Sequence, residues 1–200
     1  MNARRVATAG VIAAVYAVLT FIVVVFLPLQ LGEGLVQFRL SEALTVTAVL
    51  TPAAIPGLFI GSALANLLSV SKYGPIGLLD VAFGSLGTLL GAMWSWRFRR
   101  RVPVALLGPV IFNALIVPAY LPLMFGAAGL TTIPILGITL KSAWPVLYLA
   151  GVVAIGVGQA VVVYGLGWPL LTVLRRVPLP GIEDAQAPAD RSARSRGTRS

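Results

Sequence analysis

The segment TPAAIP, residues 51–56, decides how the chain is folded. It interrupts an apolar stretch, residues 43–70, that exceeds the roughly 20 residues of one ordinary membrane-spanning helix. Its two prolines, Pro52 and Pro56, each remove a backbone donor and end or kink a helix. The stretch therefore forms either one long span or two short spans, about 40–52 and 54–70, that meet at this segment.

The whole chain has the composition of an integral membrane protein. Of its 200 residues 58% are hydrophobic and 10% are charged, and the mean hydropathy is +0.94. A soluble chain carries about 25% charged residues, so this one cannot cover a water-facing surface. The sequence therefore predicts an all-α protein that crosses a lipid bilayer several times and resides in the cell membrane.

Missing residue types exclude several kinds of chemistry. The chain has no Cys and no His, which excludes disulfides, thiolate catalysis and zinc sites built from those residues. Neither Lys72 nor Lys141 lies in a phosphate-binding G-x-x-x-x-G-K-[ST] loop. We therefore expect no metal, no cofactor and no ATPase activity in this chain. The net charge of +9 is attributed to membrane topology, not to nucleic-acid binding.

Arginine clusters decide between the two interpretations of residues 43–70. They lie at residues 4–5, 97–101 and 175–176, and the positive-inside rule places all three in the cytoplasm. An even number of crossings must then separate consecutive clusters, which favours two spans over one. The prediction is six helices, both termini cytoplasmic, in a domain of residues 1–176. The predicted helices are about 6–29, 40–52, 54–70, 76–96, 103–125 and 142–174.

Two regions depart from this regular pattern. The second helix, about 40–52, is short for a full crossing and is expected to be tilted or irregular. Residues 177–200 are polar, with Pro, Ser, Arg and three acids and no apolar period, so we expect a disordered cytoplasmic tail.

Small residues recur at four-residue spacing on the first helix. Ala9, Ala13 and Ala17 form one stripe, and Gly10 and Ala14 lie beside it. Such stripes allow two helix backbones to approach closely in lipid. Packing within the chain and docking of a partner helix both remain open.

Polar and aromatic side chains gather in the predicted outer half of the bundle. They come from five helices and are candidates for a ligand pocket: Arg39, Glu42, Asn66, Asp80, Asn113, Tyr120, Trp144 and Tyr148. Charges within a membrane span are costly and usually mark function. The inner half is almost wholly apolar, with Gln159 near the midplane, which suggests a pocket open only to the outside.

Structural roles remain open for each candidate. Arg39 and Glu42 could pair along one helix, Asp80 could cap a helix start, and the aromatic residues could form an interfacial belt. Asn66, Asn113 and Gln159 could link helices within the bundle.

Three stretches of the sequence carry a family resemblance. They are QFRLSEALT (37–45), TPAAIPGLFIG (51–61) and LLDVAFGSL (78–86). They resemble the QueT family of queuosine-precursor transporters, over about residues 5–172. That family supplies substrate-binding S components to energy-coupling factor (ECF) transporters. The resemblance implies an S-component bundle of six helices whose ATP hydrolysis is performed by two separate ATPases. It also implies that an A-x-x-x-A face of the first helix docks on a shared membrane subunit.

The ligand that the resemblance implies is a 7-deazaguanine base. A carboxylate can accept two adjacent N–H groups of such a base, and Glu42 is the first candidate for that role. Arg39, Gln37 or an Asn could donate to its carbonyl, and Asp80 could meet a cationic substituent. Trp144, Tyr148, Tyr120 or Phe38 could stack on the ring. An S component for another vitamin or nucleobase-like molecule and a solitary secondary transporter are the alternatives, and an enzyme is not expected.

Overall fold

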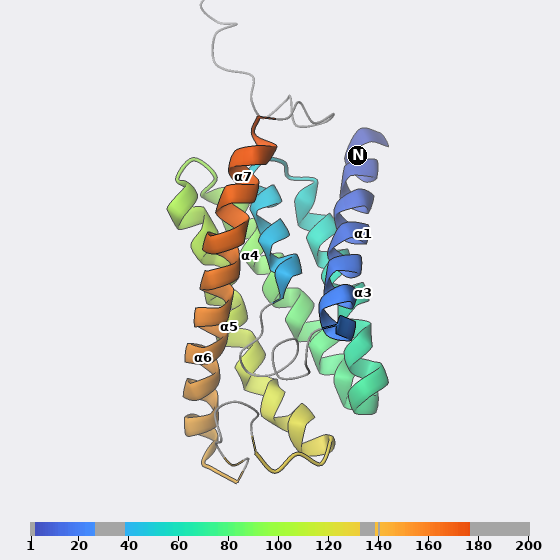
Figure 1. The fold of residues 1–200 in the computed structure, drawn as a ribbon, viewed down its shortest axis with the longest axis vertical. Coiled ribbons are helices and arrows are strands. Elements are labelled where there is room, and N and C mark those ends of the chain that lie inside the picture. Colours follow the sequence, from blue (N-terminus) through green and yellow to red (C-terminus); the bar gives the residue numbers. More distant parts are fainter. Residues whose placement is uncertain (1–2, 27–38, 133–138, 140, 177–200) are drawn as a thin grey trace, which may run out of the picture.

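The computed structural model describes residues 3–26, 39–132, 139 and 141–176. Its elements form an elongated bundle of helices that run roughly parallel to one long axis (Figure 1). In chain order they are α1 (Ala3–Phe26), η1 (Leu40–Val49), α3 (Ala54–Tyr73), η2 (Gly74–Gly77), η3 (Asp80–Gly84), α4 (Ser85–Arg97), α5 (Val102–Ala127), α6 (Trp144–Ala160), η4 (Val161–Gly167) and α7 (Trp168–Leu174). The last three continue one another as a single long helix.

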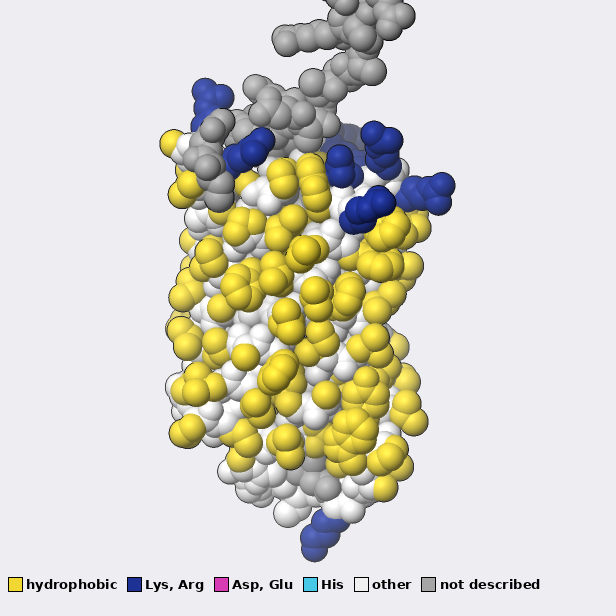
Figure 2. Space-filling view, turned by 180° about the vertical axis from the view of Figure 1, so that it is seen from behind, with side chains coloured by type: hydrophobic (Ala, Val, Ile, Leu, Met, Phe, Trp, Pro, Cys, Tyr) yellow, Lys and Arg dark blue, Asp and Glu magenta, His cyan; other side chains and the backbone are white. Residues whose placement is uncertain are grey.

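Four of these helical segments are long and apolar enough to cross a membrane: Ala3–Phe26, Ala54–Gly77, Val102–Ala127 and Trp144–Leu174. The shorter η1 is also apolar. Hydrophobic side chains cover the flank of the bundle, and Lys and Arg side chains lie at its two ends (Figure 2). This distribution suits a lipid environment, and the expectation of an all-α membrane protein is confirmed.

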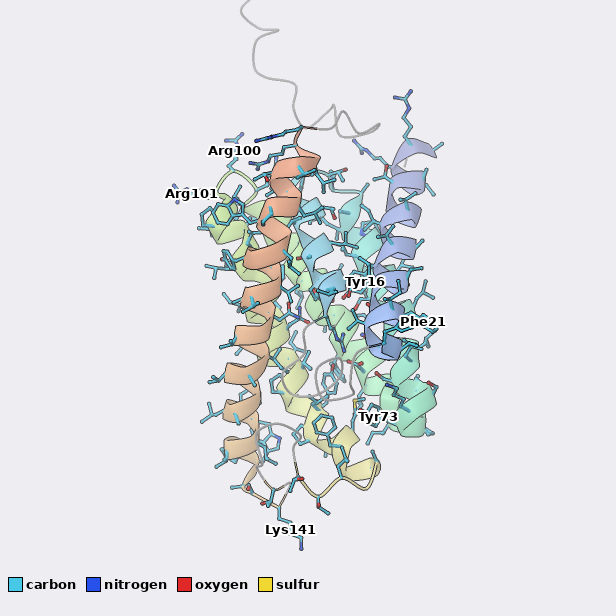
Figure 3. All side chains as sticks on the ribbon, in the orientation of Figure 1. Tyr16, Phe21, Tyr73, Arg100, Arg101 and Lys141 are labelled. Carbon is cyan, nitrogen blue, oxygen red and sulfur yellow. The ribbon has the colours of Figure 1, made fainter. Side chains whose placement is uncertain are left out.

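Both ends of the described chain lie at the same end of the bundle. The start of α1 and the end of α7 are at the top of Figure 1. Arg100 and Arg101, in the turn between α4 and α5, lie at this end too, and Lys141 lies at the opposite end (Figure 3). We refer to the arginine-rich end as the basic end.

The apolar stretch around TPAAIP is divided into two elements. η1 ends at Val49 and α3 begins at Ala54, so the break falls on the proline-containing segment. η1 is a 3₁₀ helix of 10 residues, although 3₁₀ runs longer than about four residues are uncommon. The Thr45 and Thr47 hydroxyls donate to the carbonyls of Glu42 and Leu44, each at 2.6 Å, which supports the tighter winding. The expectation of an irregular second helix is confirmed.

Small residues bring α1 and α3 into direct backbone contact. A Cβ added at Gly57 would lie 2.7 Å from the Ala9 carbonyl oxygen, and one added at Gly61 would lie 2.8 Å from the Ala13 carbonyl oxygen. Ala9 and Ala13 are buried in this contact. The two helices therefore pack through facing small-xxx-small stripes.

This contact predicts a strong difference between two glycine substitutions. Gly61→Ala should lower the free energy of unfolding by about 1–3 kcal/mol, because the new methyl group meets the backbone of α1. Gly10→Ala is the matched control, since nothing lies within 4 Å of a Cβ there. It should be neutral or stabilise the helix by about 0.5–1 kcal/mol. Denaturation of both variants in the same detergent compares them, and equal stability of the two would contradict the described contact.

Candidate functional site

Three charged side chains lie inside the bundle. In the described part of the chain, the buried charged residues are Arg39, Glu42 and Asp80, with 8%, 0% and 3% of their surface exposed. Arg39 directly precedes η1, Glu42 lies in its first turn, and Asp80 is the first residue of η3. Because a charge within a membrane span is costly, each requires partners, and those partners define the site.

The first network is centred on the Asp80 carboxylate. Tyr120 of α5 donates its hydroxyl to Oδ1 at 2.6 Å, and Ser69 of α3 donates to Oδ2, also at 2.6 Å. Nη2 of Arg39 lies 3.3 Å from Oδ2 and 3.5 Å from Oδ1. Nη1 of Arg39 donates to the Asn66 side-chain carbonyl at 3.0 Å. Four elements, η1, α3, η3 and α5, thus meet at one ion pair.

Backbone winding at Asp80 makes room for this network. Residues Asp80–Gly84 form a π-helical turn, a feature often found at functional sites. The Asn66 amide nitrogen donates to the backbone carbonyl of Asp80 at 2.8 Å. A Cβ at Gly84 would lie 2.6 Å from Asp80 Oδ1 and 3.0 Å from the Tyr120 hydroxyl, so only glycine fits beside the carboxylate.

A second network holds Glu42. Tyr16 of α1 donates its hydroxyl to Oε1 at 2.6 Å, and Thr88 of α4 donates to the same oxygen at 3.3 Å. The Thr88 hydroxyl is also 3.2 Å from Ser62, which in turn lies 3.5 Å from the Asn66 amide nitrogen of the first network. The two networks are therefore neighbours, joined through the polar face of α3.

Glu42 has one carboxylate oxygen with no partner. Oε2 is buried and accepts no hydrogen bond from the described residues, and the same holds for Oε1 of Gln159 on α6. A buried polar atom without a partner is rare in native proteins, because it loses its hydration without compensation. Each of these two oxygens is therefore an acceptor that the described residues leave unused. No group of three or more Asp or Glu residues that could hold a metal ion occurs in the described ranges.

Comparison with protein-family models gives one decisive result. The model described as the QueT transporter matches residues 6–176, which is most of the chain. The chain belongs to the QueT transporter family. Comparisons with curated proteins and with solved structures give no match. The family supports a transporter and not an enzyme, and it agrees with the resemblance seen in the sequence.

In this QueT family member, five of the candidate binding residues come together. Arg39, Asn66, Asp80 and Tyr120 share the first network, and Glu42 forms the second. The suggested ion pair between Arg39 and Glu42 is wrong, because Arg39 pairs with Asp80. Tyr120 is 5% exposed and so does not belong to an interfacial aromatic belt.

Other candidates lie apart from these networks. Asn113 is buried, but its amide nitrogen donates to the Pro109 carbonyl in its own helix, at 2.9 Å. Trp144 is 53% exposed and stacks on Tyr148, whose hydroxyl donates to the Leu115 carbonyl of α5. The exposed position of this aromatic pair fits an interfacial belt. Gln37 and Phe38 lie outside the described residues.

The first-helix stripe divides into two faces. Ala9 and Ala13 are buried against α3 and are not available to a partner, in contrast to the docking expectation for them. Gly10 and Ala14 are exposed, and Ala17 is half-buried. The described structure leaves Gly10 and Ala14, which lie beside the buried stripe, uncovered.

Sequence reasoning missed three hydrogen-bonding partners, Tyr16, Ser69 and Thr88. Two of them were detectable from helical spacing. Tyr16 follows Ala9 and Ala13 at i+7 and i+3, so it continues their face of α1. Ser62, Asn66 and Ser69 likewise stand at i, i+4 and i+7 on one face of α3. We find no comparable signal for Thr88, since its helix begins with the irregular π turn.

Proposed function

We propose that this chain is the substrate-binding S component of an ECF-type importer and takes up a 7-deazaguanine base, a queuosine precursor. The observation that carries the proposal is the buried Glu42 carboxylate with its unpartnered Oε2. Family membership supplies the transport role, and the site supplies the chemistry for a base that presents N–H donors.

Glu42 is the proposed anchor for the guanine-like edge of the ligand. That edge presents N–H donors, and the unpartnered Oε2 can accept from them through its two lone pairs. The Tyr16 hydroxyl at 2.6 Å holds Oε1 and so fixes the plane of the carboxylate. Oε2 then remains for the ligand. An apolar membrane interior strengthens such bonds, because water does not compete for them.

Arg39 is the proposed donor to the carbonyl of the base. Its guanidinium has five N–H groups, and Asn66 and Asp80 engage only part of them. Asp80 is assigned a positioning role, since Tyr120, Ser69 and Arg39 already surround its carboxylate. In this proposal it orients Arg39 and does not meet a cationic substituent.

Six crossings with both termini in the cytoplasm are part of the proposal. The start of α1, the end of α7 and the turn with Arg100 and Arg101 share the basic end, which supports even numbers of crossings between them (Figures 1 and 3). η1 and residues 78–97 then supply the two crossings beyond the four long helices. The positive-inside rule places the basic end in the cytoplasm, so the protein is a multi-pass protein of the cell membrane.

Energy is proposed to come from a shared membrane subunit and two ATPases. The exposed Gly10 and Ala14 supply the docking face on α1. A Cβ at Gly10 meets nothing within 4 Å, so this face offers open space for a partner helix.

A variant of that face should lose transport but keep ligand binding. Gly10→Leu combined with Ala14→Leu should abolish uptake of a labelled 7-deazaguanine base by cells that also produce the partner subunits. Binding to the purified variant should equal that of the unmodified protein, because the buried networks are untouched. Gly165→Leu is the control, since it places a leucine at another position where nothing lies within 4 Å of an added Cβ. Normal uptake by the double variant would contradict docking through Gly10 and Ala14. If the unmodified protein does not bind a 7-deazaguanine base, the proposed ligand is wrong.

A further inference from the structure

Two cavities adjoin each other at the basic end, beside the turn between α4 and α5. The first, of about 420 Å³, is lined by Arg97, Phe98, Arg99, Arg100 and Arg101. The second, of about 490 Å³, is lined by Ile55, Leu90, Met93, Trp94, Trp96, Arg97, Phe98, Arg99 and Phe112. They share residues 97–99, so an arginine-lined hollow continues into an apolar groove on the flank of the bundle.

The arginines of this turn have no acidic partner in the described part of the chain. The described acids are Glu42 and Asp80, and both are buried in the networks above. Arg99 donates to the Trp96 carbonyl at 3.0 Å, and its guanidinium lies 4.0 Å from the centroid of the Trp96 ring. Topology accounts for positive charge at this end, but it does not account for a groove beside it.

The groove has a fixed wall. Nε1 of Trp94 donates to the Val104 carbonyl of α5 at 2.9 Å. The Trp94 ring lies 4.5 Å from that of Phe98 and 6.1 Å from that of Phe112. A Cβ at Gly108 would come within 2.6 Å of Trp94, so α5 approaches the indole closely. Such a preformed wall reduces the ordering cost of binding.

We propose that the two cavities together form a binding site for one anionic phospholipid. The phosphate group pairs with the arginines of residues 97–101, which recognise phosphate oxygens through paired N–H donors. An acyl chain lies in the groove along Leu90, Met93 and Trp94. The ligand must be an amphiphile, because charge and apolar surface adjoin at the boundary between the hydrophobic flank and the basic end (Figure 2).

Native mass spectrometry of the detergent-purified protein tests this site. Phosphatidylglycerol and phosphatidylcholine with identical chains are added separately, and sn-glycerol 3-phosphate serves as the soluble headgroup. The unmodified protein should retain phosphatidylglycerol selectively and should not retain the soluble headgroup. Arg97→Gln combined with Arg101→Gln should weaken retention about fivefold for each arginine removed. Arg175→Gln combined with Arg176→Gln is the matched control, because it removes the same charge from exposed positions at the end of α7.

A groove variant distinguishes a site from diffuse attraction. Met93→Trp keeps every charge but fills the groove, so it should also weaken retention of phosphatidylglycerol. Unchanged thermal unfolding of each variant without added lipid shows that the fold is intact. Equal loss in the two double-arginine variants, or unchanged retention by Met93→Trp, would overturn the proposal. If the unmodified protein retains sn-glycerol 3-phosphate as well as phosphatidylglycerol, the site binds phosphate and not a phospholipid, which would also overturn the proposal.

Discussion

Asp80→Ala is expected to lower the free energy of unfolding by about 3–5 kcal/mol, the cost of leaving one partner of a buried ion pair without the other. In this variant Arg39 keeps its bond to Asn66 but loses its counter-ion in an apolar interior. The hydroxyls of Tyr120 and Ser69 lose their acceptor as well. Denaturation in a single detergent measures the loss against the unmodified protein.

A double variant provides the control for Asp80→Ala. Arg39→Met combined with Asp80→Leu removes both charges together, and apolar replacements of a buried pair are often neutral or stabilising. We therefore expect the double variant to be clearly more stable than Asp80→Ala. If it is equally unstable, the two residues do not act as a pair, and Asp80 serves chiefly as an acceptor for the hydroxyls.

Glu42→Gln is expected to weaken binding of a 7-deazaguanine base by about 10- to 100-fold. A hydrogen bond to a charged group contributes about 1.5–3 kcal/mol, and glutamine offers an N–H where the ligand needs an acceptor. The fold should tolerate the change, because the remaining amide oxygen can still accept from Tyr16 and Thr88. Isothermal titration calorimetry measures the affinity directly. Tryptophan fluorescence suits the test less well, since Trp144 is exposed and lies apart from the networks.

Asn113→Ala is the matched control for Glu42→Gln. It also changes a buried polar side chain, but its bond goes to the Pro109 carbonyl in its own helix. Binding should be close to that of the unmodified protein. Unchanged affinity of Glu42→Gln would exclude Glu42 from the site, and equal losses in both variants would point to a general effect on the bundle.

Much of the fold follows from the sequence. The prolines at 52 and 56 predicted the break between η1 and α3, because proline restricts helix continuation in any environment. The polar positions Arg39, Asn66 and Asp80 were recognised because a charge or amide within an apolar run is costly wherever the run is placed. The sequence predicted that these polar side chains would lie close together, but it did not predict which of them form hydrogen bonds or ion pairs with one another.

The pairing itself depends on three-dimensional distances. Arg39 and Glu42 stand three residues apart, yet Arg39 pairs with Asp80, which is 41 residues further along the chain. The sequence also could not separate Ala9 and Ala13 from Gly10 and Ala14. Both sets have the same spacing, and only the position of Gly57 and Gly61 on α3 determines which set is buried.

The winding of η1 sets how far Arg39 and Glu42 lie from the break at TPAAIP. A 3₁₀ helix rises about 2.0 Å per residue and an α-helix about 1.5 Å, so its 10 residues extend about 5 Å further than α-helical winding would allow. That difference is close to one α-helical turn. Arg39 and Glu42 stand at one end of this element and the break at Pro52 follows its other end, so the winding fixes the distance between these charged residues and the break. Lengthening or shortening η1 by a residue would move the carboxylate relative to Tyr16 and Thr88, which neighbouring helices hold in place.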